Sequence, residues 1–131
     1  MSLESTRAAM SRYLDATHAD TDVIAEDAVF TVMGTGQQAH GRDAIFGMLQ
    51  YFYHVAFDAT VENPRLLVTD GHAVLEADFT GKQLLDFGGI PPTGQQVRVP
   101  LCVSYDLEND RIVQARIYFE AAALLPQAAA S

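Results

Sequence analysis

Hydrophobic positions follow a helical period in the first half of this chain and an alternating period in the second half. Two stretches carry the i, i+3, i+4, i+7 spacing that places side chains on one face of a helix. We therefore predict two amphipathic helices, the first capped by Ser2 or Ser5 and the second starting near Asp43. The apolar faces consist of Met10, Tyr13, Leu14 and Thr17 in the first helix, and of Ile45, Met48, Leu49 and Phe52 in the second.

Short elements are expected between these two helices. Residues 20–22 (DTD) indicate a helix break and a new cap, followed by a helical turn through residues 23–24. Residues 28–33 are rich in β-forming side chains and predict a short strand. Gly34 and Gly36 end that strand.

After residue 57 apolar and polar residues alternate, which is typical of strands that bury one face. The dipeptide Asp70-Gly71 predicts a tight hairpin, because glycine accepts a positive φ. Residues 108–111 are polar and predict a second turn. The strands are expected at residues 73–80, 97–107 and 112–119.

A long loop and a short C-terminal turn complete the prediction. Residues 82–96 form a loop rich in glycine and proline, and loops of this length often shape the edge of a pocket. Residues 121–125 favour a final helical turn that Pro126 limits. The alanine-rich tail, residues 127–131, is expected to fray.

The order of elements predicts an α+β fold in a single domain spanning residues 1–131. Helices come first, and long antiparallel strands follow. A strongly curved sheet wrapped around the helices makes a cone, and a cone has an interior. No internal repeat or domain linker is visible in the sequence.

Composition narrows the classes of partner. The net charge is −9 and the pI is about 4.6, which disfavours binding to nucleic acids or to anionic membranes. No apolar run approaches the roughly 20 residues that cross a bilayer. Cys102 is the single cysteine, so no internal disulfide forms. Without a signal-like N-terminus, we expect a soluble, cytoplasmic protein that binds a small apolar molecule.

Two segments resemble motifs of a known family. Residues 80–94 read TGKQLLDFGGIPPTG and residues 119–127 read FEAAALLPQ. The first resembles the Thr-Gly-Thr-His-x-Gly-Glu-Phe-x-Gly-Ile-Pro-Pro-Thr-Gly segment of SnoaL-like polyketide (ester) cyclases. The second resembles their Phe-Asp-x-x-x-Leu-Leu-x-Gln ending. Residues 27–30 and 41–45 match the family more loosely, so the likeness extends over nearly the whole chain.

The resemblance implies the cone-shaped fold of the nuclear-transport-factor-2-like (NTF2-like) superfamily, a homodimer, and cyclase chemistry with an aspartate acid/base assisted by a histidine. Three positions depart from the family pattern. Gln83 stands in place of the motif histidine, Arg116 in place of a tryptophan, and Glu120 in place of the terminal aspartate. The neighbouring strand offers Cys102, Ser104 and Asp106, and no histidine.

Glu120 is the first candidate for chemistry. Burial in an apolar pocket raises the pKa of a carboxyl group, and such a group can remove a proton next to a carbonyl. The alternative is a surface carboxylate that caps the final helical turn. Arg116 and Tyr118 share the face of Glu120, where an arginine would instead keep the carboxylate ionised or form an exposed ion pair. If the apolar face of this strand, with Ile117 and Phe119, lines the pocket, these polar residues face solvent or a partner.

Other candidates come from the helices and their surroundings. Tyr13 is either a core aromatic residue or a hydrogen-bond donor to a ligand. His54 lies near a helix end close to Tyr51 and Tyr53 and is a candidate for catalysis. Phe30, Phe52 and Cys102 complete the expected substrate-binding set, although a cysteine is more often a small buried apolar residue than a nucleophile.

No metal or cofactor is expected. The positions of His18, His40, His54 and His72 do not form a zinc-binding spacing, and no nucleotide-binding motif is present. Glu76 and Asp78 form a carboxylate pair, which is more typical of a solvated sheet face than of a cation site.

Two functional hypotheses remain at this point. One is a cofactor-independent enzyme that uses Glu120, Tyr118 and His54 on an apolar carbonyl compound. The other is a non-catalytic small-molecule-binding or dimerising protein on the same fold.

Overall fold

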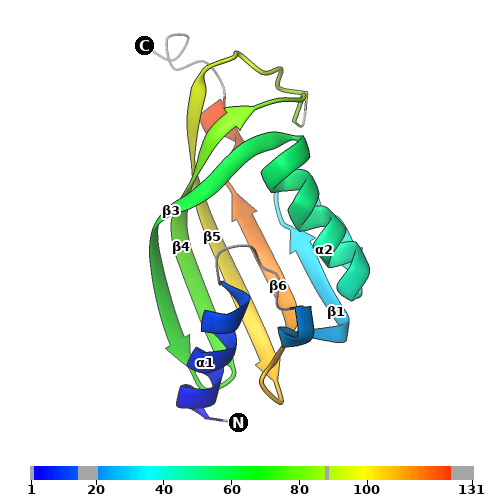
Figure 1. Ribbon diagram of the computed structural model, residues 1–131, viewed down its shortest axis with the longest axis vertical. Coiled ribbons are helices and arrows are strands. Elements are labelled where there is room, and N and C mark those ends of the chain that lie inside the picture. Colours follow the sequence, from blue (N-terminus) through cyan, green and yellow to red (C-terminus); the bar gives the residue numbers. More distant parts are fainter. Residues whose placement is uncertain (1, 15–20, 88, 125–131) are drawn as a thin grey trace.

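A computed structural model of the chain describes residues 2–14, 21–87 and 89–124. Two helices and a curved six-stranded sheet build one α+β unit (Figure 1). The helical elements are α1 (Leu3–Tyr13), the 3-10 turns η1 (Thr21–Val23) and η3 (Ala121–Leu124), α2 (Arg42–Gln50) and its π-helical continuation η2 (Tyr51–Val55). The strands are β1 (Ile24–Val32), β2 (Gln37–His40), β3 (Phe57–Thr69), β4 (His72–Gln83), β5 (Gln96–Glu108) and β6 (Arg111–Phe119).

The sheet has the order β2-β1-β6-β5-β4-β3. All neighbouring strands are antiparallel except β1 and β6, which are parallel. The sheet is strongly curved and does not close into a barrel, so β2 and β3 are its two edges. This is the cone that the alternating pattern predicts.

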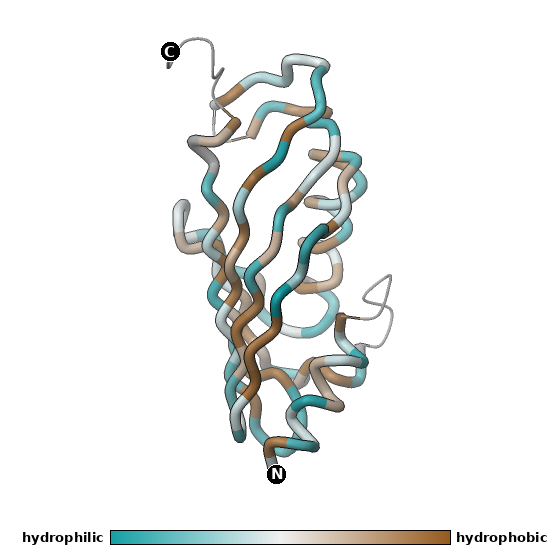
Figure 2. The backbone as a smooth tube through the Cα atoms, turned by 90° about the vertical axis from the view of Figure 1, so that its left-hand side faces the viewer, coloured by the Kyte–Doolittle hydropathy of each residue, from teal (hydrophilic) through white to brown (hydrophobic). Residues whose placement is uncertain are grey.

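Both helices lie on the same side of the sheet (Figure 2). The helix α1 packs against β3 and β4, whereas α2 packs against β1 and β2. Each presents the face that its sequence spacing predicts, with Met10 and Tyr13 buried in α1 and Ile45 and Met48 buried in α2. The space between the helices and the concave side of the sheet contains the core.

Local sequence signals account for the ends of several elements. Ser2 caps α1 as predicted, in a capping box with Ser5, whose amide donates to the Ser2 hydroxyl at 3.1 Å. Gly71 adopts a φ of 81°, as the predicted Asp70-Gly71 hairpin requires. Asn109 and Asp110 both have positive φ in the turn between β5 and β6.

The structure also corrects several boundaries. Residues 37–40 form the edge strand β2, which the sequence pattern had not predicted, and His40 is its last residue. The first long strand, β1, begins at Ile24, which the sequence pattern had placed in a helical turn. The strand β4 continues to Gln83, so the long loop starts only at residue 84. The predictions for Thr17, His18 and the tail 127–131 lie outside the described residues.

A β-bulge divides β3. Between Glu62 and Arg65 the strand takes three steps, while its partner β4 takes only two, from Asp78 to Glu76. The extra residue exchanges the two faces of the strand. As a result the odd-numbered residues before the bulge and the even-numbered residues after it point toward the same side of the sheet.

Candidate functional site

A pocket of about 610 Å³ lies between the concave face of the sheet and the helices. Its walls come from α1, α2, η2 and the strands β1 and β3 to β6. The volume falls within the range of small-molecule sites in proteins. The concave side of the sheet therefore carries a partly open pocket.

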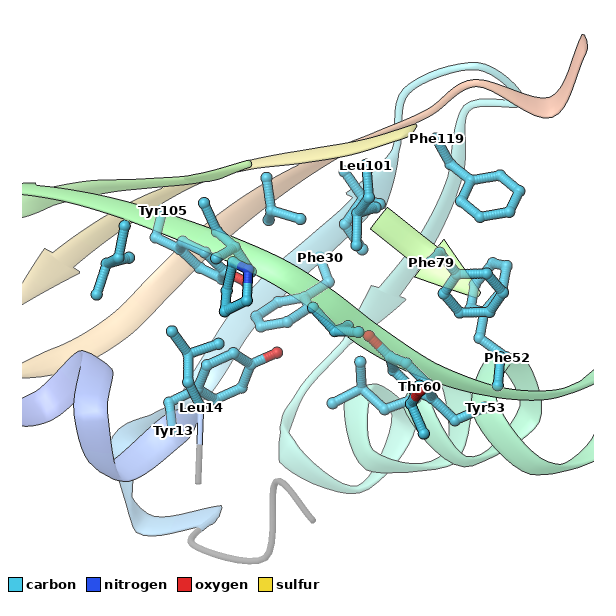
Figure 3. Close-up of a pocket in the computed structure, with 18 of the residues that line it drawn as sticks. Tyr13, Leu14, Phe30, Phe52, Tyr53, Thr60, Phe79, Leu101, Tyr105 and Phe119 are labelled. Atoms are coloured by element: carbon cyan, nitrogen blue, oxygen red, sulfur yellow. The ribbon is translucent and has the colours of Figure 1, made fainter. Parts of the chain in front are cut away.

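Two tyrosines form one end of the pocket, next to α1 (Figure 3). The rings of Tyr13 and Tyr105 meet edge to face with centroids 5.5 Å apart. Phe30 packs against both of them, at 6.2 Å from Tyr13 and 6.5 Å from Tyr105. The exposed fractions of Tyr13 and Tyr105 are only 2% and 3%.

The hydroxyl groups of Tyr13 and Tyr105 form a hydrogen bond with each other. Burial raises the pKa of both groups, and this bond raises the pKa of Tyr13 further while it opposes the increase for Tyr105. Both side chains therefore remain neutral at physiological pH.

Phenylalanines form the opposite end of the pocket (Figure 3). Phe79 and Phe119 meet at 5.2 Å, and Phe52 lies 6.2 Å from Phe119. Phe57 and Phe87 pack behind this group, at 5.0 Å from Phe79 and 5.3 Å from Phe119 respectively. Such edge-to-face aromatic packing makes an apolar wall with a defined shape.

The few polar groups between these ends are uncharged or weakly basic. They belong to Ser11, Gln50, Tyr53, His54 and Thr60. Burial raises the pKa of Tyr53 to about 12. Among the residues that the structure describes, no aspartate, glutamate, lysine or arginine lines the pocket. This composition suits a neutral ligand, because an ion would lose its hydration there without gaining a charged partner.

Four of the predicted site residues line the pocket, namely Tyr13, Phe30, Phe52 and His54. His54 comes from the π-helical turn η2, which widens the end of α2. Its side chain is exposed, so it lies where the pocket meets solvent. Helical turns of the π type occur often at functional sites.

The other four predicted residues, Glu120, Tyr118, Arg116 and Cys102, do not line the pocket. The physical reason is the two-residue period of the strands. The apolar residues Ile117 and Phe119 of β6 face the cavity, and so do Leu101 and Val103, the neighbours of Cys102 on β5. Tyr118 and Glu120 are exposed. The structure therefore does not place Glu120 in the hollow, and it does not bring Tyr118, Arg116 or Cys102 to this pocket.

Arg116 instead belongs to a polar network on the outer face of the sheet. Its guanidinium donates to both carboxylate oxygens of Asp106 and to the Ser104 hydroxyl. His72 also contacts Asp106, with 2.9 Å between Nδ1 and Oδ1. These hydrogen bonds, first of all the one from Arg116, lower the pKa of Asp106. Arg116, at the position where the resemblance implies a tryptophan, thus forms an ion pair with Asp106.

Gln83, at the position of the family's motif histidine, is buried and points at the loop that follows it. Its side-chain amide donates to the carbonyls of Leu85, at 2.9 Å, and Ile90, at 2.7 Å. Phe87 and Ile90 also exchange two backbone hydrogen bonds of 2.9 Å. Gln83 therefore holds the loop that carries Phe87 against the phenylalanine end of the pocket.

Sequence reasoning missed Tyr105 as a site residue. The alternation of residues 97–107 placed it on the same face as Leu101 and Val103, and both of these line the pocket. A hydroxyl on an otherwise apolar strand face was the available signal. Pro64 was also missed, because the change of face in β3 is not visible in a simple alternation. Thr60, between Ala59 and Val61, was missed as well.

Within residues 2–14, 21–87 and 89–124, no three histidine, cysteine, aspartate or glutamate side chains are grouped so that they would hold a metal ion. No helix in that same part of the chain is long and apolar enough to cross a membrane.

Comparison with known proteins gives one family and many solved structures of the same shape. Residues 7–128 match the sequence profile of the SnoaL-like polyketide cyclases. No curated protein sequence matches the chain.

Three similar structures illustrate the shared fold. A candidate polyketide cyclase from Xanthomonas campestris pv. campestris is 18% identical, with a TM-score of 0.73 over 88% of this chain and 90% of that one. A candidate SnoaL-like polyketide cyclase from Jannaschia sp. CCS1 is 20% identical, with a TM-score of 0.71 over 94% of each chain. A hypothetical protein with a ketosteroid isomerase-like fold from Catenulispora acidiphila, solved in complex with trimethylamine, is 18% identical. Its TM-score is 0.69 over 92% of this chain and 88% of that one.

Proposed function

Since this chain belongs to the SnoaL-like polyketide cyclase family, we propose that its pocket binds a neutral, largely apolar small molecule that carries a carbonyl or hydroxyl oxygen. The observation that carries the proposal is the buried Tyr13–Tyr105 hydroxyl pair at the end of an apolar cavity of about 610 Å³. In the proposed complex Tyr13 donates to Tyr105, and Tyr105 donates to the oxygen of the ligand. The aromatic wall around Phe79 and Phe119 holds the apolar part.

The charge of the ligand follows from the lining. A carboxylate or an ammonium group would enter a site whose described lining contains no aspartate, glutamate, lysine or arginine to pair with it. The net charge of −9 further disfavours an anion. We therefore expect 2-acetylnaphthalene, a neutral ketone, to bind more tightly than 2-naphthoate, its anionic counterpart of similar size.

Fluorescence titration tests this proposal. The probe is 6-propionyl-2-dimethylaminonaphthalene, a neutral ketone whose emission shifts to the blue in apolar surroundings. We expect saturable binding that Tyr105→Phe weakens about fivefold, the effect of one lost hydrogen bond. Tyr118→Phe is the matched control, since it also removes a tyrosine hydroxyl, but one that lies on the outer face of the sheet. Equal affinities in the wild type and Tyr105→Phe would contradict the proposed contact, and the absence of saturable binding would contradict the proposed function.

Proton transfer next to a carbonyl is a second candidate function, favoured by the presence of His54 at the pocket and by the family match. In this reaction the His54 imidazole removes a proton from the carbon beside the ketone. The electron pair of that C–H bond moves into an enolate, whose oxygen accepts the hydrogen bond from Tyr105. Return of a proton to the carbon completes the exchange.

Deuterium exchange separates the two candidate functions and tests the role first assigned to Glu120. The methyl protons of 2-acetylnaphthalene are followed by NMR in D2O with and without protein. If the protein is an enzyme of this type, His54→Gln abolishes the protein-dependent exchange while Glu120→Gln leaves it unchanged. Exchange that depends on Glu120 would restore the original hypothesis, and binding without exchange would leave a binding protein.

A further inference from the structure

The bulge in β3 determines which side chains of this edge strand reach the pocket. Ala59 and Val61 line the pocket before the bulge, and Pro64 and Leu66 line it after the bulge. In a regular strand, residues separated by an odd number of positions face opposite sides. Without the extra residue, Leu66 would therefore point away from the cavity that Val61 faces.

Asn63 provides the unusual backbone of the bulge. Its φ is 55°, in the left-handed region that asparagine tolerates better than most residues. The next residue, Pro64, has no N–H group to donate, which suits an edge strand. The pair Asn63-Pro64 thus bends β3 and brings a rigid ring to the rim of the pocket.

Side chains on the outer face of the sheet hold this bulge in place. The Asn63 amide Nδ2 donates to Oδ2 of Asp78 on β4 at 3.1 Å. Arg98 on β5 donates to the same oxygen at 2.7 Å, and a second nitrogen of its guanidinium lies 3.7 Å from a carboxylate oxygen of Glu62. Asp78 therefore connects the central strand β5 to the bulge at the edge of the sheet.

We propose that Asp78 is a positioning residue that fixes Asn63 in the bulge. It thereby determines how far Pro64 reaches into the pocket, and so how large a ligand fits beside β3. Asp78 does not line the pocket, so it acts through its bond with Asn63 and through Arg98, which lies close to Glu62. This inference rests on the proposed function of the pocket, and it assigns ligand selectivity to a carboxylate on the opposite face of the sheet.

The test compares two neutral ketones that differ in size. The larger is 6-propionyl-2-dimethylaminonaphthalene and the smaller is acetophenone, measured by its displacement of the larger. We expect Asp78→Ala to change the ratio of the two dissociation constants about fivefold in favour of the larger ketone, on the scale of one lost hydrogen bond. Asp78→Asn keeps an oxygen that can accept from Asn63, so it should restore much of the original ratio.

Glu76→Ala is the matched control. Glu76 lies on the same strand and face as Asp78, and its carboxylate is 3.7 Å from Arg65 just beyond the bulge. It has no hydrogen bond to Asn63 among those that the structure describes. We expect this variant to keep the wild-type ratio. An equal change of both dissociation constants in Asp78→Ala, or the same change of ratio in Glu76→Ala, would overturn the proposal.

Hydrogen exchange in the ligand-free protein gives a second readout. We expect Asp78→Ala to accelerate exchange of the amides of residues 61–66 while the amides between β4 and β5 keep their protection. Unchanged exchange in residues 61–66, with ketone binding retained, would overturn this inference alone. If the wild type binds neither ketone, the proposed function fails together with the role in selectivity, and the exchange data still show whether Asp78 holds the bulge.

Discussion

Arg116 and Asp106 form a bidentate pair across β5 and β6, with guanidinium nitrogens 2.9 Å from each carboxylate oxygen. Because the charged form of Asp106 accepts these bonds, its pKa lies below the ordinary value. A carboxyl group with a lowered pKa in the folded state stabilises the protein above its unfolded-state pKa, and that stabilisation is lost as the pH falls through the folded-state value.

Asp106→Asn should therefore lower the free energy of unfolding at pH 7 and make that free energy less dependent on pH in the acid range. We expect a loss of about 1 kcal/mol at pH 7, the scale of a well-formed, partly exposed ion pair. The difference from the wild type should shrink below about pH 4, where Asp106 of the unfolded chain is protonated. Urea unfolding followed by circular dichroism at pH 7 and pH 3 measures both values, with Asp58→Asn as a control. A difference that does not depend on pH would contradict the expected linkage.

Gly81→Ala should be strongly destabilising. Gly81 on β4 has a φ of 156°, and a Cβ atom at this position would overlap the carbonyl oxygen of Asp58 on the neighbouring strand. We expect the free energy of unfolding to fall by about 2–4 kcal/mol, because the backbone of the neighbouring strand would have to move. Gly47→Ala in α2 is the control, since nothing lies within 4 Å of its Cβ position and alanine favours a helix by about 0.5–1 kcal/mol. Similar melting temperatures for the two variants would contradict the close approach of the Asp58 backbone to Gly81.

Gln83→Ala should loosen the loop that closes the phenylalanine end of the pocket. It removes the donor to the Leu85 and Ile90 carbonyls, so we expect a loss of about 1–3 kcal/mol. Limited proteolysis with chymotrypsin should then cleave near Phe87 faster than in the wild type. Gln95→Ala, at an exposed position of the same loop, is the control. Equal cleavage rates in the two variants would show that Gln83 does not hold the loop.

The buried tyrosines should make the protein sensitive to alkali. Burial raises the pKa of Tyr53 to about 12 and raises the pKa of Tyr13 and Tyr105 as well. A tyrosine with a raised pKa stabilises the folded state fully below its unfolded-state pKa of about 10, and this contribution is lost as the pH rises through the folded-state value.

Stability should accordingly fall from about pH 10 upward, and less steeply in Tyr105→Phe than in the wild type. Ultraviolet difference spectroscopy gives the number of phenolates formed, and circular dichroism at the same pH values reports folding. Tyr118→Phe serves as the exposed control. Ionisation of Tyr13 and Tyr105 in a protein that remains folded would contradict their burial.

Particular residues show how far sequence patterns reach. The spacing of Met10 and Tyr13 is sufficient to predict the buried face of α1, because helical periodicity is a local property. Asp70-Gly71 predicts the β3–β4 hairpin for the same reason, since the turn depends on the φ of one glycine. The fold of the SnoaL-like family was also recognisable, from the residues around Gly89 and Phe119. The homodimer and cytoplasmic location stay predictions.

Glu120 shows where those patterns stop. The alternation of β6 separates an apolar face with Ile117 and Phe119 from a polar face with Arg116 and Tyr118. The alternation does not indicate which of these two sides of the strand is directed toward the helices. That choice depends on the direction in which the sheet curves, and the curvature results from contacts between residues far apart in the chain.

The amino-acid sequence by itself determined the two helices, the cap at Ser2, the two tight turns, and the division of each regular strand into two faces, because these follow from the local period of the backbone. Only the tertiary structure decided that the apolar face of β6 encloses the pocket, that Tyr13 meets Tyr105, and that β3 changes face at Asn63. Each of these depends on which distant segments pack together, and long-range packing has no signature in the spacing of neighbouring residues.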